Sequence, residues 1–187
     1  MRIIAGKFRS LQLSTVPGMD VRPTMDRVRE SLFSILSDHV SGALVLDLFS
    51  GSGALGLEAL SRGALAAHFV ESGRGVIPVL RKNIERLAGI DATIHPFPVE
   101  KALPRLAALK LKFDLVFLDP PYRRNLVPPV LERLIALGLP SSSGRIVAEH
   151  EVRFQPPREV GNWFRVDSRT YGDTALSIYS PLSGQEG

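Results

Sequence analysis

The sequence predicts an α/β fold, in which a mostly parallel sheet has helices on both faces and ends in an antiparallel hairpin. Two observations predict it. From residue 44 onwards, short apolar runs alternate with stretches of helical periodicity, which is typical of parallel strands joined by helical crossovers. The end of the chain instead holds two strand-like segments around Tyr171, Gly172 and Asp173, which favours a hairpin.

Each expected element follows from its own pattern. Loose alternation around Gly6 predicts a short hairpin or extended arm over residues 2–16, and Thr24 is expected to cap a helix that runs to Ser37. The closing hairpin is expected over 163–170 and 174–179. Strands are expected over 44–49, 66–70, 92–95, 113–118 and 145–149, and helices over 54–62, 74–87, 103–109 and 127–137.

Composition narrows the class of protein. With 187 residues, 44% of them hydrophobic, the chain is long enough for one globular domain. Cysteine is absent, which excludes disulfides, thiolate metal sites and cysteine nucleophiles. The four histidines have no metal-ligand spacing, so no metal is expected. Because no apolar run is long enough to cross a membrane, we expect a cytoplasmic protein, and we expect it to be a monomer.

The net charge is +4, and basic residues gather at the start of the chain. Residues 1–19 carry Arg2, Lys7 and Arg9 without any acidic residue, and Arg22 and Arg29 follow. A basic leading segment is typical of proteins that contact nucleic acid, although a solvated basic face has the same composition.

A glycine-rich turn follows the first predicted strand. Gly51, Gly53 and Gly56 match the G-x-G-x-x-G pattern of dinucleotide sites, and Glu71 stands 20 residues after Gly51, where an acid that binds ribose is expected. Asp47 argues against a pyrophosphate, because its carboxylate would lie near the two phosphates. A ligand with a cationic amino end removes that conflict, and S-adenosylmethionine is such a ligand. The alternative that these residues only cap a turn and pack closely stays open.

A second motif, formed by Asp119, Pro120, Pro121 and Tyr122, follows the predicted strand 113–118. Ligands of open α/β sheets bind at the carboxyl ends of the strands, so Asp119 is expected near the glycine turn. The prolines lack N–H donors, which leaves acceptors suited to an NH₂ group, and Tyr122 offers a face on which a base can stack. This pattern favours methyl transfer to an exocyclic amine. The alternative is that Asp119 caps the next helix and Pro120 opens it.

These motifs resemble those of class I S-adenosylmethionine methyltransferases that act on exocyclic amines. Residues 22–33, 46–58 and 118–122 closely resemble the bacterial RsmD-type 16S ribosomal RNA guanine-N2 methyltransferases, and the resemblance spans nearly the whole chain. It implies a Rossmann-like fold, with residues 1–40 as a basic RNA-binding arm and helix and residues 41–187 as the methyltransferase domain. It also implies S-adenosylmethionine as the cofactor and 16S ribosomal RNA, within a 30S subunit or an assembly intermediate, as the substrate.

The resemblance further implies roles for individual residues. The target guanine would be received by Asp119, Pro120, Pro121 and Tyr122, and the cofactor would be held by Asp47, Ser50, Gly51, Gly53, Glu71 and Glu100. Apart from the resemblance, charge and position in the chain predict contacts with RNA from Arg2, Lys7, Arg9, Arg22, Arg29, Arg123 and Arg124. Glu149, which ends a predicted strand, is expected to touch the site.

Two positions depart from the family pattern. Gly73 stands where an acid or amide is usual, and Lys101 stands where an aspartate is common. Ribose binding is therefore expected to rest on Glu71 alone, and Glu100 is the substitute candidate for the adenine contact.

Other functions stay open on the sequence alone. The same motifs suit an amino-methyltransferase that acts on DNA adenine or cytosine, or on protein glutamine. The glycine turn alone suits a nicotinamide-dependent dehydrogenase, which would bind NAD in preference to S-adenosylhomocysteine. An inactive RNA-binding module would bind RNA without any methyl transfer.

Overall fold

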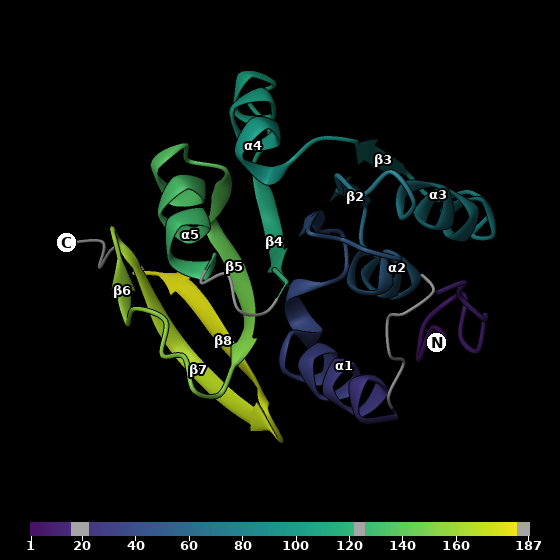
Figure 1. Cartoon of the computed structure of the whole chain (residues 1–187), viewed down its shortest axis with the longest axis horizontal. Coiled ribbons are helices and arrows are strands. Elements are labelled where there is room, and N and C mark those ends of the chain that lie inside the picture. The colour runs from purple at the N-terminus through teal and green to yellow at the C-terminus, as the bar shows by residue number, and fades with distance from the viewer. Residues whose placement is uncertain (16–22, 122–125, 183–187) are drawn as a thin grey trace.

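The computed structural model describes residues 1–15, 23–121 and 126–182. Over these residues the strands form one eight-stranded sheet in the order β3-β2-β1-β4-β5-β8-β7-β6 (Figure 1). The parallel part contains β1 (Leu44–Leu48), β2 (Ala66–Val70), β3 (Ala92–His95), β4 (Phe113–Leu118) and β5 (Pro140–Glu151). The antiparallel part contains β6 (Glu159–Val160), β7 (Trp163–Tyr171) and β8 (Thr174–Pro181). The predicted α/β fold with its closing hairpin is confirmed.

Helices cover both faces of the sheet (Figure 1). One layer holds α1 (Pro23–Ile35), α2 (Ala54–Ser61) and α3 (Ile77–Glu85), and the other holds α4 (Val99–Ala108) and α5 (Val127–Ala136). A short 3₁₀ helix, Ser37–His39, stands between α1 and β1. None of the helices described reaches the length and apolar character that a membrane span requires.

The strands are buried on both faces because alternate side chains point into different layers. In β4, Phe117 packs among the core residues beneath α1 and α2, whereas Leu118 packs among those beneath α4 and α5. Ile3 and Leu13 of the N-terminal arm (residues 1–15) belong to the same core cluster as α1 and α2. The arm is therefore part of the folded body, and Arg2 and Gln12 pair across it in an antiparallel bridge.

The expected helix bounds are wrong for α1, which begins at Pro23, before the expected cap Thr24, and for α3, which begins at Ile77 rather than at residue 74. Three other elements differ more. α4 begins at Val99 and includes Pro104, whose missing N–H would have bonded the carbonyl of the exposed Glu100. β5 begins at Pro140, because Ser141–Gly144 form an irregularity in its pairing with β4 rather than a loop. β6 is a two-residue strand that the sequence pattern did not reveal.

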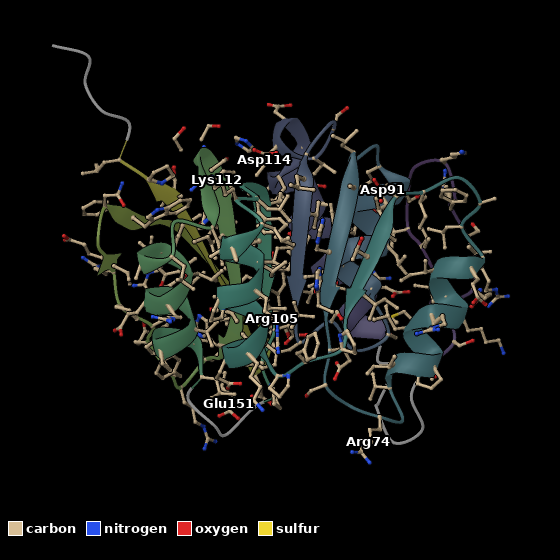
Figure 2. All side chains as sticks on the ribbon, turned by 90° about the horizontal axis from the view of Figure 1, so that it is seen from above. Arg74, Asp91, Arg105, Lys112, Asp114 and Glu151 are labelled. Carbon is tan, nitrogen blue, oxygen red and sulfur yellow. The ribbon has the colours of Figure 1, made fainter. Side chains whose placement is uncertain are left out.

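The order of the strands reverses between β1 and β4, which are direct neighbours. Leu48 pairs with Leu118 across these strands, so the segments that follow them leave the sheet side by side. Figure 2 shows the two edges of the sheet: Lys112 and Asp114 lie at one edge, and Arg74 and Glu151 lie at the other, where the parallel strands end. Ligands of open α/β sheets bind at this second edge.

Candidate active site

The turn after β1 bends sharply because alternate residues adopt positive φ. The values are 58° at Phe49, 54° at Gly51 and 84° at Gly53. A residue other than glycine at positive φ, here Phe49, costs about 1–3 kcal/mol of backbone strain. Such strain concentrates at functional sites. Ser50 ties the turn to the next strand, because its N–H donates to the Val70 carbonyl at 3.1 Å. Gly53 is then the N-cap of α2, without a side-chain hydrogen bond, so the start of α2 lies at the ligand-binding edge.

Asp47 is a buried carboxyl group at the end of β1. It is 2% exposed, and its Oδ2 accepts a hydrogen bond from the Gly56 N–H at 2.9 Å. Burial raises the pKa of Asp47 to about 7, the negative charge of Glu71 adds to the rise, and the hydrogen bond opposes it. A nearby ammonium group would stabilise the charged form. Gly56 itself is required for packing, since a Cβ there would lie 2.3 Å from a ring carbon of Phe69.

Glu71 closes the glycine turn from the end of β2. Its Oε1 accepts from the N–H groups of Ser72 and Gly73, both at 2.7 Å, and its Oε2 accepts from the Gly51 N–H at 2.9 Å. An ionised carboxylate has about four acceptor positions, so capacity for a ribose hydroxyl remains. At Gly73 a Cβ would lie 2.7 Å from a methyl group of Val76, so a larger residue there would have to displace that side chain.

Asp119 and Glu149 stand on neighbouring parallel strands. Leu118 of β4 pairs with Ala148 of β5, so the next residue of each strand points to the opposite layer, toward α1. Burial raises the pKa of Asp119 well above its ordinary value, and the negative charges of Glu149 and Asp47 raise it further. Three carboxyl groups therefore interact at the ends of β1, β4 and β5.

Asp119 and Glu149 line a cavity of about 280 Å³, which we call the acceptor cavity. It lies between α1, the start of α2, the ends of β4 and β5, and the turn between β7 and β8. A hydrogen bond of 2.5 Å between the hydroxyls of Ser31 and Tyr171 ties that turn to α1. The apolar walls of the acceptor cavity include Val28, Leu32, Leu55, Val147 and Leu176. A cavity with apolar walls and with the acids Asp119 and Glu149 in its lining suits a ring that carries an amino group.

The rest of the second motif is described only in part. Pro120 is buried and Pro121 is exposed. α5 begins at Val127 with Leu126 as its N-cap, so the alternative that Asp119 caps the following helix is wrong. Four residues with predicted roles lie outside the described residues: Arg22, Tyr122, Arg123 and Arg124. Their roles stay predictions.

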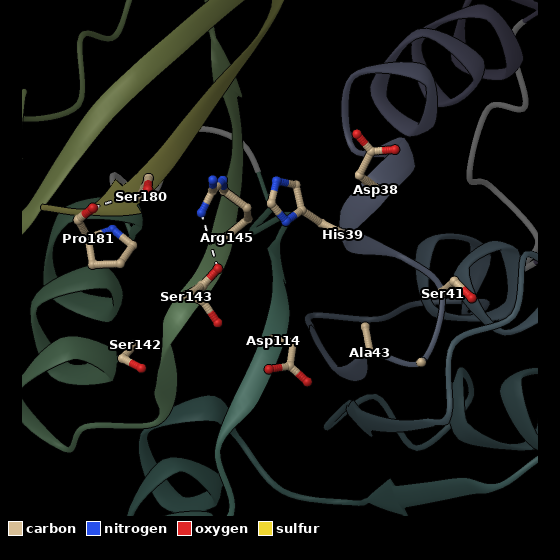
Figure 3. Close-up of a pocket in the computed structure, with 11 residues that line it drawn as sticks. Asp38, His39, Ser41, Ala43, Asp114, Ser142, Ser143, Arg145, Ser180 and Pro181 are labelled. Atoms are coloured by element: carbon tan, nitrogen blue, oxygen red, sulfur yellow. Dashed lines mark hydrogen bonds between the residues drawn. The ribbon is translucent and has the colours of Figure 1, made fainter. Parts of the chain in front are cut away.

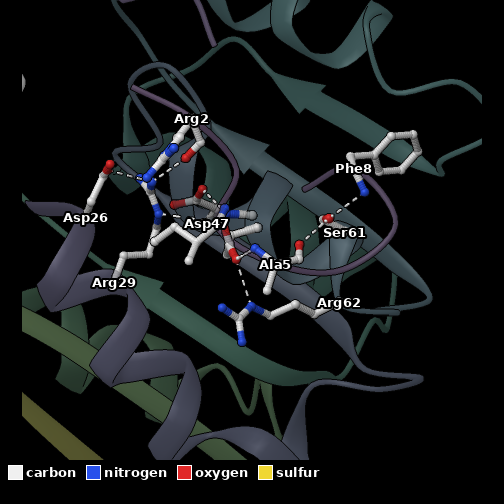
Figure 4. Close-up of polar contacts among 11 residues, drawn as sticks. Arg2, Ala5, Phe8, Asp26, Arg29, Asp47, Ser61 and Arg62 are labelled. Atoms are coloured by element: carbon white, nitrogen blue, oxygen red, sulfur yellow. Dashed lines mark hydrogen bonds and ion pairs between the residues drawn. The ribbon is translucent and has the colours of Figure 1, made fainter. Parts of the chain in front are cut away.

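The arm is fastened to α2 by two buried side chains that the sequence analysis missed (Figure 4). Glu58 is 0% exposed, and its carboxylate accepts from the N–H groups of Ile4 at 2.8 Å and Ala5 at 3.0 Å. Ser61 Oγ donates to the Ala5 carbonyl at 2.6 Å and accepts from the Phe8 N–H at 3.0 Å. A lone acid in an otherwise apolar helix is a signal that would have singled out Glu58.

The side chain of Arg29 is buried, whereas its position in the basic leading segment suggested an exposed one. It is 5% exposed, and its Nη2 donates to the Arg2 carbonyl at 2.5 Å and to Asp26 at 3.0 Å (Figure 4). Its Nε lies 3.7 Å from Glu58. This guanidinium is therefore enclosed and joins α1 to the arm, while Arg29 also lines the acceptor cavity, and its contact with RNA stays a prediction. RNA contacts stay predictions for three side chains that are exposed, Arg2, Lys7 and Arg9.

A buried amide joins the arm to the glycine turn. Asn83 of α3 is 0% exposed; its Oδ1 accepts from the Ser14 N–H at 2.7 Å, and its Nδ2 donates to the carbonyls of Ser14 and Ser52, both at 2.9 Å. No local pattern in the sequence predicted this role. Glu100 is exposed in the first turn of α4, and its adenine contact stays a prediction.

A second cavity, of about 590 Å³, is larger but lies at the other edge of the sheet (Figure 3). His39, Asp114 and Arg145 are among its lining residues. Arg145 turns back onto its own chain, donating to the carbonyls of Ser143 and Gly144. We assign the site to the smaller cavity because the interacting carboxyl groups and the strained turn lie at that edge.

Known proteins resemble this chain over nearly its whole length. A family model described as Conserved hypothetical protein 95 matches residues 1–180. "Putative rRNA methyltransferase YlbH" of Bacillus subtilis is 36% identical over 96% of this chain and 98% of its own length. "Ribosomal RNA small subunit methyltransferase D" of Escherichia coli is 37% identical over 96% of this chain and 89% of its own length. A solved structure, "Putative methyltransferase yhhF from Escherichia coli", is 37% identical, has a TM-score of 0.85 and covers 97% of each chain.

Proposed function

The chain belongs to the family described as Conserved hypothetical protein 95, and we infer from this membership that it is a methyltransferase that acts on ribosomal RNA. We propose that it transfers a methyl group from S-adenosylmethionine to the exocyclic N2 amine of a guanine in 16S ribosomal RNA. The observation that carries the proposal is the pair of interacting acids at the ends of the neighbouring strands β1 and β4, the buried Asp47 and the half-buried Asp119. We further propose that the protein acts as a monomer, on a 30S subunit or an assembly intermediate.

The donor side of the site fits the methyl donor. Asp47 would hold the amino end, because a buried acid with a raised pKa gains from a cation beside it. Glu71 would hold the ribose with its remaining acceptor capacity, and the turn through Gly51 lets backbone approach the ligand, since a Cβ there would meet only the Phe49 carbonyl, at 3.9 Å. When bound, S-adenosylmethionine supplies a methyl carbon on a positively charged sulfur, and the nitrogen–carbon bond forms as the carbon–sulfur bond breaks.

The acceptor side supports an exocyclic amine as the nucleophile. Such an amine is a poor nucleophile because its lone pair is conjugated with the ring. Asp119 would accept a hydrogen bond from the amine, turn the lone pair out of conjugation and stabilise the positive charge that develops on nitrogen. The same carboxylate would take the proton that nitrogen loses, and its raised pKa favours that transfer.

The test is incubation of the protein with methyl-labelled S-adenosylmethionine and either 30S subunits or naked 16S ribosomal RNA, followed by digestion to nucleosides. We expect the label in N2-methylguanosine. Label in adenine or cytosine would contradict the guanine assignment, and RNA binding without any label would favour the inactive RNA-binding module.

Asp119→Asn tests the role of the acid. The amide keeps the size and one acceptor oxygen but loses the charge, so we expect kcat to fall by about 10²–10³-fold with binding of S-adenosylhomocysteine preserved. Asp114→Asn is the matched control, because Asp114 lies in β4 too but at the opposite edge of the sheet (Figure 2). An Asp119→Asn protein with unchanged kcat would refute the assigned role.

A further inference from the structure

We propose that Glu149 is the residue that selects the base: its carboxylate accepts the N1–H of the target guanine while Asp119 receives the neighbouring N2 amine. This inference rests on the proposed function and assigns the specificity of that same site. It starts from the position of Glu149 in the acceptor cavity.

Glu149 and Asp119 are placed to contact one edge of a single base. They occupy adjacent positions on β4 and β5, one residue beyond the pair Leu118 and Ala148, and both line the cavity. Neighbouring strands lie about 4.8 Å apart, so the two carboxylates can reach two adjacent groups on one ring. The negative charge of Glu149 raises the pKa of Asp119, as expected for two carboxyl groups at adjacent positions.

The chemistry of the amino bases decides which of them fits two acceptors. In guanine the N2 amine has the N1–H donor beside it, so the edge presents donors to both carboxylates. In adenine and cytosine the amine has a ring nitrogen acceptor beside it, and a carboxylate there would face a lone pair. Such a carboxylate would gain no hydrogen bond from the base and would be repelled by the lone pair, so the second carboxylate disfavours these bases.

The groups around Asp119 and Glu149 also favour guanine as the ligand. Asp47, Asp119 and Glu149 gather three carboxyl groups at one edge, and the negative charges of Glu149 and Asp47 raise the pKa of Asp119. A ligand that brings donors to this edge relieves the repulsion. The apolar walls, with Leu32 from α1 and Leu176 from β8 among them, offer surfaces for the ring of the base.

The test first removes the hydrogen on N1 of the target base and then replaces the carboxylate of Glu149. The wild-type protein first labels 16S ribosomal RNA, and the labelled nucleotide is located. Two RNAs are then assembled by ligation, with either guanine or 2-aminopurine at that position; 2-aminopurine keeps the 2-amino group but has an acceptor at N1. We expect kcat/KM of the wild-type protein to be about 100-fold higher on guanine. Glu149→Gln, whose amide can donate to the N1 acceptor, is expected to lower this preference to less than about tenfold.

Controls separate the possible failures. Glu151→Gln lies two residues further along the same strand, outside the residues that line the acceptor cavity, and is expected to keep the wild-type preference. Binding of S-adenosylhomocysteine to Glu149→Gln checks that the donor side is intact. If the wild-type protein labels guanine and Glu149→Gln keeps the same preference, even at reduced activity, the inference is overturned while the proposed function stands. If the wild-type protein labels no guanine, the proposed function fails as well.

Discussion

Replacing Glu58 by alanine should release the N-terminal arm from α2. The carboxylate is fully buried and accepts hydrogen bonds from Ile4, Ala5 and, at 2.8 Å, from Arg62 Nε, with Arg29 Nε at 3.7 Å. Breaking a buried ion pair by removing one partner costs about 3–5 kcal/mol, because the other charge stays buried without compensation. We therefore expect Glu58→Ala to lower the free energy of unfolding by about 3–5 kcal/mol.

Urea unfolding measures this loss, with the slope of the transition checked for two-state behaviour. Glu58→Gln keeps one acceptor oxygen and should lose less, about 1–3 kcal/mol. Glu30→Ala is the matched control, because Glu30 is an exposed acid on α1 and its removal should change stability by less than about 0.5 kcal/mol. Hydrogen exchange should accelerate selectively at the Ile4 and Ala5 amides. A loss for Glu58→Ala below about 1 kcal/mol, with protection of these amides unchanged, would refute the reasoning.

Three further predictions concern the turn and the arm. The folded pKa of Asp47, about 7, lies above the ordinary value of 3.8, so the folded state binds the extra proton; stability should fall as pH rises between these values, and Asp47→Asn should flatten that slope in urea unfolding. Gly6→Ala places a Cβ 1.8 Å from the Ser61 carbonyl oxygen and should weaken RNA binding in a filter assay, whereas Gly89→Ala, also at positive φ but with open space around it, should not. Asn83→Leu removes three hydrogen bonds and should lower the affinity for S-adenosylhomocysteine in calorimetry; an unchanged affinity would contradict the link between the arm and the turn.

The order and type of the elements could be predicted because hydrophobic periodicity reports burial directly. The strands Ala66–Val70, Ala92–His95 and Phe113–Leu118 have the bounds that their apolar runs predict. The position of Asp47 and Asp119 on adjacent strands was also predictable, since the reversal of strand order brings the ends of β1 and β4 together in this class of sheet.

The contacts that join distant segments could not be predicted from local patterns. Glu58 meets residues 4 and 5 more than 50 positions away, and Asn83 meets Ser14 69 positions away. The burial of Arg29 was missed for the same reason. An arginine on a helix is usually exposed, and the sequence does not show which acidic side chains lie near it in the fold. Such contacts depend on the docking of the arm, on which local propensity carries no information.

The turn that joins β7 to β8 forms a wall of the acceptor cavity, although it belongs to the antiparallel end of the sheet, away from the glycine turn. If the proposed function holds, insertions and substitutions in this hairpin should change which base the cavity admits without changing the residues assigned to the methyl donor. Grafting hairpins of different lengths onto this scaffold would then alter the target while Asp47 and the glycine turn stay as they are.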